Sequence, residues 1–279
     1  MIDFENKVVA VTGAASGLGK GMATRMAQGG ARLALADRHA ASLLEFADQL
    51  RADGASVITT VLDVRDCDAV MGFADSTFAA YGEVDYAINS AGMSSMGSIF
   101  KLPLEEWRLL FETNVMGLVH GIRAFVPRMI GQNRECHVVN VASNAGLESN
   151  AFLPAYFMSK HAAVSVTESL AIELQTIQSK VKAYVFCPGL VQTPLSYNSA
   201  EVRGTDDPYY QTDEFTMLSD LGRRALAAGM PLDEALDGFL AGLEADNFYI
   251  RTHANEEGQV TYRTEMVLNR TRPLPIPAR

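Results

Sequence analysis

Cysteine is scarce in this chain, and the three cysteines form no recognisable set. Cys67, Cys136 and Cys187 are widely spaced and odd in number, which favours neither a disulfide framework nor a CxxC metal site. The five histidines are equally scattered. We therefore expect no metal site, and the simplest account of this composition is a reducing, cytoplasmic compartment.

Basic charge and long apolar runs are also lacking. The chain has 33 Asp and Glu against 23 Lys and Arg, a formal net charge of −10. This balance opposes binding to nucleic acid or to an anionic membrane. No apolar run approaches the roughly 20 residues that a membrane span needs, and Met1–Gly13 lacks the regions of a secretory signal. We expect no nucleic-acid or membrane partner.

Short apolar runs alternate with longer stretches of helical periodicity. The runs that predict strands are Lys7–Thr12, Arg32–Ala36, Ser56–Leu62, Val84–Asn89, His137–Ala142, Lys182–Cys187 and Phe248–Ile250. The stretches that predict helices include Leu18–Gln28, Ala41–Asp53, Cys67–Tyr81, Leu104–Ile130, Ala155–Ile177 and Leu232–Leu243. Continuously apolar strands indicate a parallel sheet with helices on both faces. We predict one Rossmann-type, doubly wound, seven-stranded α/β domain over residues 1–279.

Two regions depart from this alternation. Leu195–Met230 mixes aromatic residues with charges and glycines and is too long for an ordinary connection, so it is either a substrate lid or disordered. The tail, Gly258–Arg279, ends in Pro273, Pro275 and Pro277, and we expect it to run extended over the surface.

A glycine-rich turn, Gly13-x-x-x-Gly17-x-Gly19, follows the first predicted strand. Glycines permit a tight turn, and the following helix offers free N–H groups to a pyrophosphate. The spacing differs from GxGxxG. A P-loop would need glycine in place of Ala14 and Ser or Thr in place of Gly21, so we exclude it. A turn that only reverses the chain is the remaining alternative.

Asp37 closes the second predicted strand, where a carboxylate can accept hydrogen bonds from an adenosine ribose and repel a 2′-phosphate. The adjacent Arg38 could instead receive that phosphate. Ser16 is uncharged, so the glycine turn supplies no second basic residue. These residues favour NAD over NADP, and a strand-end turn residue is the alternative for Asp37.

Tyr156 and Lys160 are four residues apart in a predicted helix, so their side chains share one face. An ammonium beside a phenol favours the phenolate and should lower the tyrosine pKa from about 10 towards neutrality. Ser143 follows a predicted strand thirteen residues upstream. Ser143 alone could be a strand-end cap, and Lys160 alone could be a solvated helix lysine. It is improbable that both of these alternatives hold at once.

With these residues in order, the chain resembles the short-chain dehydrogenase/reductase family from about Lys7 to Thr193, and more weakly to Thr252. The matching motifs are Thr12–Gly19, Asp63-Val64, Asn89-Ser90-Ala91-Gly92, Asn114-Val115, Ser143, Tyr156 with Lys160, and Pro188-Gly189 leading to Thr193. Ser90 stands where the family usually carries a second asparagine.

The resemblance implies a nicotinamide cofactor and its contacts. These would come from Gly13, Ser16, Gly17, Leu18, Gly19, Asp37, Arg38, Asp63, Val64, Asn89, Ala91, Gly92, Tyr156, Lys160, Pro188, Gly189, Val191 and Thr193. Asp63 would bind the adenine amino group, Asn89 would brace the fourth strand, and Thr193 would help to hold the nicotinamide.

The resemblance also implies the chemistry. Tyr156 would be the general acid in carbonyl reduction and the general base in alcohol oxidation. Lys160 would lower its pKa and bind the nicotinamide ribose, and Ser143 would hydrogen-bond the substrate oxygen. In the family, the residue at Asn114 anchors a water that leads to the lysine. Without the resemblance, a satisfied core amide would be the first interpretation of Asn114.

We therefore expect an oxidoreductase acting on a secondary alcohol or ketone. A non-catalytic sensor or scaffold would be expected to lack one of the three catalytic residues, and an extended-branch epimerase or dehydratase would need a different glycine spacing. The residues expected to face substrate are Ser94, Ser95, Ser143, Ala145, Leu147, Phe152, Leu153, Tyr156, Leu190 and Tyr197. Mostly apolar, they favour a bulky, uncharged aromatic or alicyclic substrate, while Arg203, Arg223 and Arg224 keep an anionic one open.

The two long predicted helices, Leu104–Ile130 and Ala155–Ile177, carry more apolar positions than packing on one sheet face requires. Pairing of these helices about a two-fold axis would cover the surplus, as in a homodimer or homotetramer. The alternative is that the chain's own lid and tail cover them.

Overall fold

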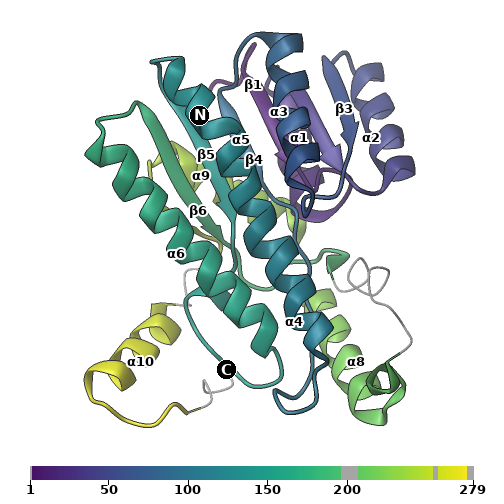
Figure 1. Ribbon diagram of the computed structural model, residues 1–279, viewed down its shortest axis with the longest axis vertical. Coiled ribbons are helices and arrows are strands. Elements are labelled where there is room, and N and C mark those ends of the chain that lie inside the picture. Colours follow the sequence, from purple (N-terminus) through teal and green to yellow (C-terminus); the bar gives the residue numbers. More distant parts are fainter. Residues whose placement is uncertain (1, 196–206, 254–256, 275–279) are drawn as a thin grey trace.

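The computed structural model describes residues 2–195, 207–253 and 257–274. Its centre is a parallel seven-stranded sheet in the order β3-β2-β1-β4-β5-β6-β7 (Figure 1). The strands are β1 (Val8–Thr12), β2 (Arg32–Asp37), β3 (Val57–Val61), β4 (Tyr86–Asn89), β5 (Cys136–Val141), β6 (Val181–Cys187) and β7 (Tyr249–Arg251). All strand pairs are parallel, so the predicted Rossmann-type fold is confirmed.

Helices cover both faces of the sheet. They are α1 (Gly17–Gln28), α2 (Ala40–Ala52), α3 (Cys67–Tyr81), α4 (Leu104–Phe111), α5 (Gly117–Gly131), α6 (Pro154–Thr176), α8 (Asp213–Ala227), α9 (Leu232–Glu244) and α10 (Glu257–Leu268). Alternate residues of β1 serve the two faces: Val9 and Val11 pack with α1, α2 and α9, while Val8 and Ala10 pack with α3, α5 and α6. Burial on both faces explains why the strands are apolar throughout.

The chain reverses direction across the sheet between β1 and β4. From β1 it proceeds outward through β2 to β3, then returns to β4 on the other side of β1. The register pairs Thr12 with Ala36 on one side and with Asn89 on the other, so the carboxyl ends of these strands are level. Ligands of open α/β sheets bind at such a switch point.

The helical run Leu104–Gly131 consists of α4, a π-helical turn (η1, Glu112–Met116) and α5. By length and composition it could cross a membrane, with a mean hydropathy of 1.2, but 56% of its most apolar window is buried inside the protein. Core helices of water-soluble folds meet the same criterion, so this run is weak evidence for a membrane partner.

The expectation of an extended tail is wrong for the residues that form α10. Residues 257–268 contain no proline, so nothing interrupts the helix until Pro273, beyond its end. In the region expected to be a lid or disordered, residues 196–206 lie outside the described part. The remainder contains a short 3-10 helix, η3 (Pro208–Gln211), and α8, whose N-cap Thr212 accepts a hydrogen bond from the Phe215 N–H. Its role as a lid stays a prediction.

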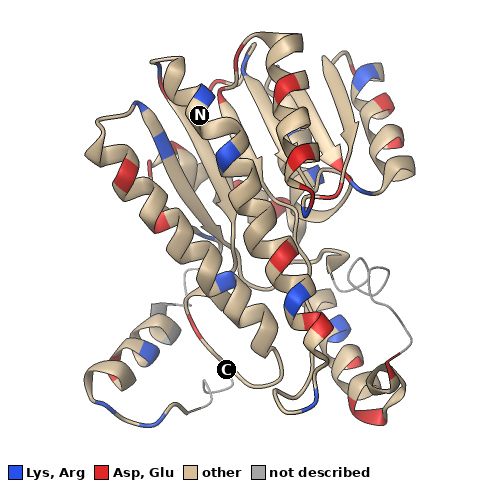
Figure 2. Ribbon diagram, in the orientation of Figure 1, with Lys and Arg blue, Asp and Glu red and all other residues tan. Residues whose placement is uncertain are grey.

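Acidic and basic side chains are interspersed along the helices in the view of Figure 2. One network is centred on a buried carboxylate: Asp85 pairs with the partly exposed Arg134 and Lys7 and accepts the Val8 N–H at 2.8 Å. Burial raises the pKa of Asp85, but the hydrogen bonds from Arg134 and Val8 lower it by a larger amount, so the net pKa is below its usual range.

Candidate active site

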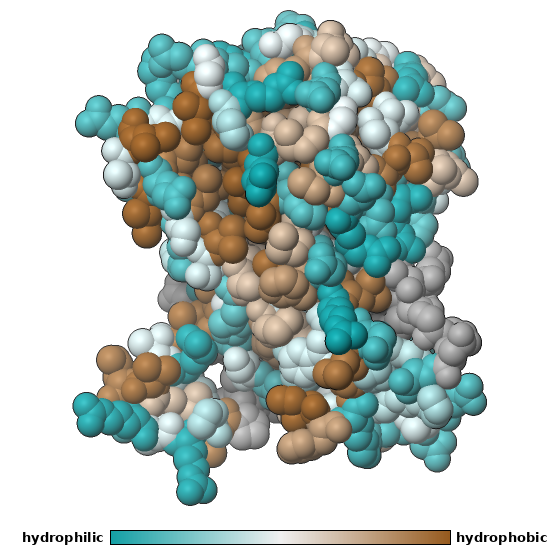
Figure 3. Space-filling model, viewed as in Figure 1, coloured by the Kyte–Doolittle hydropathy of each residue, from teal (hydrophilic) through white to brown (hydrophobic). Residues whose placement is uncertain are grey.

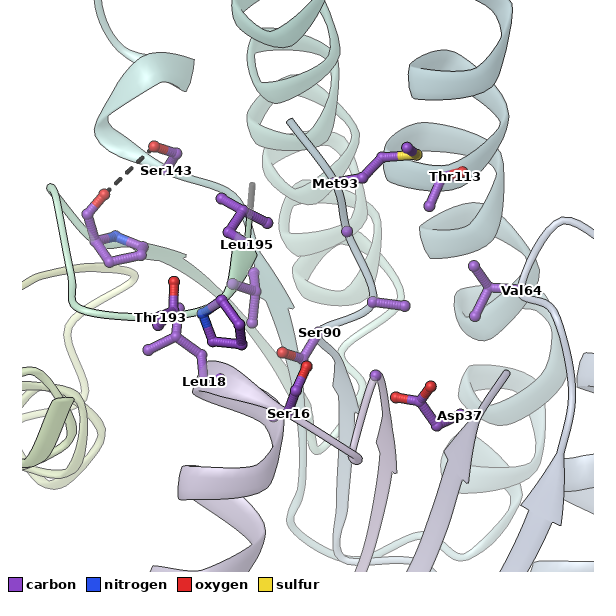
Figure 4. A pocket seen from close by; sticks show the side chains of 18 of the residues that line it. Ser16, Leu18, Asp37, Val64, Ser90, Met93, Thr113, Ser143, Thr193 and Leu195 are labelled. Carbon is purple, nitrogen blue, oxygen red and sulfur yellow. Dashed lines mark hydrogen bonds between the residues drawn. The ribbon is translucent and has the colours of Figure 1, made fainter. Parts of the chain in front are cut away.

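A cleft opens at the carboxyl ends of the central strands. It encloses about 1130 Å³ including solvent at its mouth. The residues expected to bind cofactor line it, with the exception of Asn89: Gly13, Ser16, Gly17, Leu18, Gly19, Asp37, Arg38, Asp63, Val64, Ala91, Gly92, Tyr156, Lys160, Pro188, Gly189, Val191 and Thr193. Figure 4 shows Asp37 and Val64 towards one end and Ser143 and Thr193 towards the other.

The glycine turn forms the middle of the cleft, and three of its residues need to be glycine, among them Gly19, where a Cβ would clash with the carbonyl oxygen of Gly13. Gly13 has a φ of +67°, and a Cβ there would lie 2.7 Å from the backbone of Ala91. Gly17, at φ +52°, begins α1 after the extended N-cap Ser16. The first turn of α1 carries no acidic residue, so its free N–H groups suit an anion. This part of the cleft fits the pyrophosphate of a dinucleotide.

Asp37 braces the glycine turn. Its side chain is buried, Oδ2 accepts a hydrogen bond from the Ala15 N–H at 3.0 Å, and Oδ1 accepts one from the His39 N–H at 2.9 Å. Each carboxylate oxygen can accept a second hydrogen bond. Asp37 is therefore placed to receive a ribose hydroxyl while it also holds the turn, a second role that sequence reasoning missed.

Arg65, which no sequence motif indicated, binds the carboxylate of Asp63 through hydrogen bonds. Arg65 donates from Nη2 to Oδ2 at 2.6 Å and from Nε to Oδ1 at 3.0 Å. Burial raises the pKa of Asp63, but the Arg65 hydrogen bonds outweigh it, so the net pKa is lowered. The carboxylate is ionised, and an adenine amino group would have to share it with Arg65.

Ser143, Tyr156 and Lys160 meet at the other end of the cleft. The Ser143 Oγ accepts the Ala145 N–H at 3.1 Å and lies 3.4 Å from the Pro188 carbonyl, the dashed line in Figure 4. It also hydrogen-bonds Tyr156. Lys160 is 5% exposed and donates to the Val141 carbonyl at 3.0 Å. A strand end and one helix thus bring together a hydroxyl, a phenol and an amine.

The expected lowering of the tyrosine pKa is contradicted. Burial raises the pKa of Tyr156 to about 12, although the Ser143 hydrogen bond opposes the rise. The Lys160 Nζ lies 5.7 Å from the centre of the phenol ring and is directed to the Val141 carbonyl, so desolvation dominates. Burial also lowers the pKa of Lys160 to about 8. At neutral pH the phenol is protonated and the amine remains mostly charged.

Asn114 lies in the π-helical turn η1, buried beside the cleft but not lining it. Its amide donates to the Met93 carbonyl and to the Ser159 hydroxyl, each at 2.9 Å, and its Oδ1 accepts the Met93 N–H at 2.8 Å. This is the satisfied amide that ranked first without the resemblance. A Cβ on Gly92 would lie 3.4 Å from Asn114 Oδ1 and 3.5 Å from Lys160 Nζ. Single π turns often occur at functional sites.

The family model described as short chain dehydrogenase matches residues 7–203. The chain belongs to the short-chain dehydrogenase family. It is 31% identical over 272 residues to a CLA biosynthesis dehydrogenase/reductase of Lactiplantibacillus plantarum, covering 96% of this chain and 95% of that one. It is 34% identical over 249 residues to a 1-deoxy-11-beta-hydroxypentalenate dehydrogenase of Streptomyces avermitilis, covering 88% and 84%.

A solved structure extends this likeness to the whole chain. The crystal structure of a short chain dehydrogenase/reductase from Burkholderia phymatum in complex with NAD has a TM-score of 0.94 and 33% identity, with 100% of both chains covered. A nicotinamide cofactor is therefore supported for this short-chain dehydrogenase, and the glycine turn provides a site that fits one.

Asn89 of this short-chain dehydrogenase lies outside the cleft and braces the sheet. Its Nδ2 donates to Asn140 Oδ1 at 2.8 Å, Asn140 donates to the Thr167 hydroxyl at 3.0 Å, and Thr167 donates to the Ala163 carbonyl at 2.7 Å. This buried chain of hydrogen bonds ties β4 and β5 to α6, which agrees with the expected bracing of the fourth strand.

The substrate side was predicted less well. Of the residues expected to face substrate, Ser143 and Tyr156 line the cleft, whereas Ala145, Leu147, Leu153 and Leu190 do not, and Tyr197 lies outside the described residues. Leu190 and Phe152 are about half exposed and Ala145 is buried beneath Ser143. Lining residues that were missed include Met93, Thr113, Leu195 and Leu226. Met93 could have been inferred because it follows Gly92, but Leu226 reaches the cleft only through the docking of α8.

Proposed function

We propose that this short-chain dehydrogenase is an NAD-dependent oxidoreductase that interconverts a secondary alcohol and a ketone. The observation that carries the proposal is that one cleft holds Ser143, Tyr156 and Lys160 at one end, Asp37 at the other, and the glycine turn between them. The NAD complex of the Burkholderia phymatum protein and the dehydrogenase names of the relatives support it.

The residues divide the chemistry as follows. The bound cofactor supplies or accepts a hydride. Tyr156, protonated at neutral pH, donates its proton to the carbonyl oxygen in reduction, and its deprotonated phenolate accepts a proton from the alcohol in oxidation. The Ser143 hydroxyl hydrogen-bonds the same oxygen and stabilises the charge that develops there. The Lys160 ammonium is held beside Tyr156 by the Val141 carbonyl and offers its other protons to the cofactor ribose.

NAD is the preferred cofactor in this proposal because the buried carboxylate of Asp37 would repel a 2′-phosphate. Arg38 and His39 line the same end of the cleft, and this specific observation favours the second candidate, an NADP-preferring ketoreductase. The ratio of kcat/KM for NADH and NADPH decides between them.

The substrate is proposed to be bulky, uncharged, and aromatic or alicyclic. Met93, Leu195 and Leu226 give the cleft apolar walls, and Met93 belongs to the same hydrophobic cluster as Tyr156. The name of the Streptomyces avermitilis relative specifies a dehydrogenase of a hydroxylated substrate, which agrees with alcohol oxidation. A non-catalytic sensor or scaffold is the alternative from another class.

A panel of ketones and secondary alcohols, assayed with NAD(H) and NADP(H), tests the proposal. Turnover of a two-ring ketone with NADH at a kcat/KM well above that for small ketones is expected. Tight binding of NADH without turnover of any substrate in the panel would instead favour the sensor.

We also propose that two or four copies associate through α4, α5 and α6 in a reducing, cytoplasmic compartment. Apolar side chains gather over α6 in Figure 3, where Ile172 and Ile177 are 64% and 59% exposed, and Leu104 of α4 is 66% exposed. The three cysteines form no disulfide, and two of them are buried.

A further inference from the structure

Three aromatic rings from late in the chain pack together beside α4. Tyr209 and Tyr210 belong to η3 and Phe215 to α8, and we call them the aromatic triad. Their ring centroids lie 6.0, 5.7 and 5.2 Å apart, and every pair meets edge to face. This geometry stabilises ring pairs beyond the burial of their surface. In Figure 1, α4 and α8 lie next to each other at the end of the molecule below the sheet.

The triad forms the layer behind the catalytic end of the cleft. The hydrophobic cluster that contains it also contains Met93 and Tyr156, and both of these residues line the cleft. Tyr209 is 7% exposed and Met93 is 3% exposed, so both side chains are shielded from solvent. Because a close-packed cluster transmits displacement, a shift of the triad would change the position of the wall beside Tyr156.

A buried carboxylate holds the triad in place. Glu106 of α4 is 1% exposed, and its Oε1 accepts a hydrogen bond from the Tyr210 hydroxyl at 3.0 Å. Burying a carboxylate among apolar side chains is costly unless it is hydrogen-bonded. Glu106 lies in the first turn of α4, where the helix dipole also favours negative charge.

A second link between the same segments is an ion pair of Lys101 with Glu214 at the surface. The lysine side chain is 61% exposed, and exposed pairs contribute little. The buried hydrogen bond is therefore the stronger connection between α4 and the triad.

We propose that Glu106 and Tyr210 are positioning residues that set substrate specificity by holding the aromatic triad, which supports the wall of the cleft that Met93 and Tyr156 form. This inference rests on the proposed function and adds the residues that select the substrate. With the triad seated, a substrate bearing a ring system packs against a fixed surface. When the hydrogen bond between Tyr210 and Glu106 is removed, the wall of the cleft becomes less rigid. Large substrates then lose binding contacts that small substrates do not make.

The kinetic test compares Tyr210→Phe, Glu106→Leu and Glu106→Gln with the parent, using one two-ring aryl ketone and one small aliphatic ketone. The amide oxygen of glutamine still accepts the Tyr210 hydroxyl, so Glu106→Gln should retain kcat/KM within about threefold. Tyr210→Phe and Glu106→Leu should lose about tenfold or more in kcat/KM for the aryl ketone, mainly through KM, and little for the small ketone.

Tyr184→Phe is the matched control. It removes a similar tyrosine–carboxylate hydrogen bond, from Tyr184 to Asp246 at 2.6 Å, in a part of the sheet away from the triad. This variant should match the parent with both ketones. Equal losses for the large and small ketone, or the same loss in Tyr184→Phe, would mean that general destabilisation explains the effect and would overturn the proposal.

Hydrogen exchange gives a readout that does not depend on activity. The amides of α8 should exchange about tenfold faster in Tyr210→Phe and Glu106→Leu, whereas those of α9 should exchange as in the parent in the same two variants. If the parent reduces no ketone, the proposed function fails, and exchange alone decides whether Glu106 seats the triad. Parent-like exchange of α8 in Tyr210→Phe, an isosteric change that preserves the ring, would refute the inference in either case.

Discussion

Replacing Asp37 by alanine should destabilise the protein as well as weaken NAD binding. The buried carboxylate accepts the Ala15 and His39 N–H groups at 3.0 and 2.9 Å. Hydrogen bonds to a charged group contribute about 1.5–3 kcal/mol each. Water can enter the open cleft and replace part of this, so we take the lower end and expect a loss of about 3 kcal/mol in unfolding free energy, or about 6–12 °C in Tm.

The cofactor should report the same change. Asp37→Ala removes the ribose acceptor and loosens the glycine turn, so NADH affinity should fall by about tenfold or more, the equivalent of one charge-assisted hydrogen bond. The preference for NAD over NADP should narrow chiefly because NAD is bound less well. Thermal unfolding without ligand and fluorescence titration with NADH and NADPH measure both effects.

Asp66→Ala is the matched control, since Asp66 accepts the Ala69 N–H at 3.0 Å as the exposed N-cap of α3. Its loss should cost about 1 kcal/mol and leave cofactor affinity unchanged. If Asp37→Ala kept its Tm and bound NADPH as tightly as the parent binds NADH, Asp37 would be an electrostatic filter only, and its bracing role would be wrong.

Three further outcomes are expected. The rate of alcohol oxidation should increase as pH rises towards about 10, because burial holds the pKa of Tyr156 near 12. The rate of ketone reduction should decline above about pH 8, because Lys160 loses its proton. Initial rates across this pH range test both expectations, and flat profiles would count against both assignments. Because hydrogen bonds hold the folded pKa of Asp85 below its unfolded value of about 4, its pairing stabilises the fold above that pH, and the stabilisation decreases as pH falls through the folded pKa. In urea unfolding, Arg134→Gln should be less stable than the parent by about 1–2 kcal/mol at pH 7, and a difference that did not shrink as pH falls below about 4 would contradict this. Light scattering should find dimers or tetramers at micromolar concentration, with Ile172→Glu shifting them towards monomers; a parent that is already monomeric would rule out the interface.

The parts that were predictable depend on short-range signals. Strands such as Val8–Thr12 are apolar because both faces are buried, and the glycine turn, Asp37, Ser143, Tyr156 and Lys160 follow from spacing alone. Their convergence also follows, since the carboxyl ends of parallel strands meet at one edge of the sheet.

The parts that could not be predicted depend on tertiary packing. Leu226 lines the cleft, and Tyr210 reaches Glu106, only because the segment after β6 folds back onto α4. The pKa of Tyr156 is raised, whereas the sequence predicted that it would be lowered. The four-residue spacing shows that Lys160 is near Tyr156, but it does not show that the amine is directed to the Val141 carbonyl in a desolvated site. No local sequence pattern predicts the π-helical turn around Asn114.

Turnover of Tyr156→Phe tests the central claim most directly. The change removes one hydroxyl and keeps the ring in its cluster, so NADH affinity should stay within about threefold while ketone reduction falls by about 10²-fold or more, the usual size of a general acid–base contribution. Tyr81→Phe, which removes a hydroxyl bonded to the Leu33 carbonyl far from the cleft, should behave as the parent. Near-normal reduction by Tyr156→Phe would contradict its assignment as the proton donor.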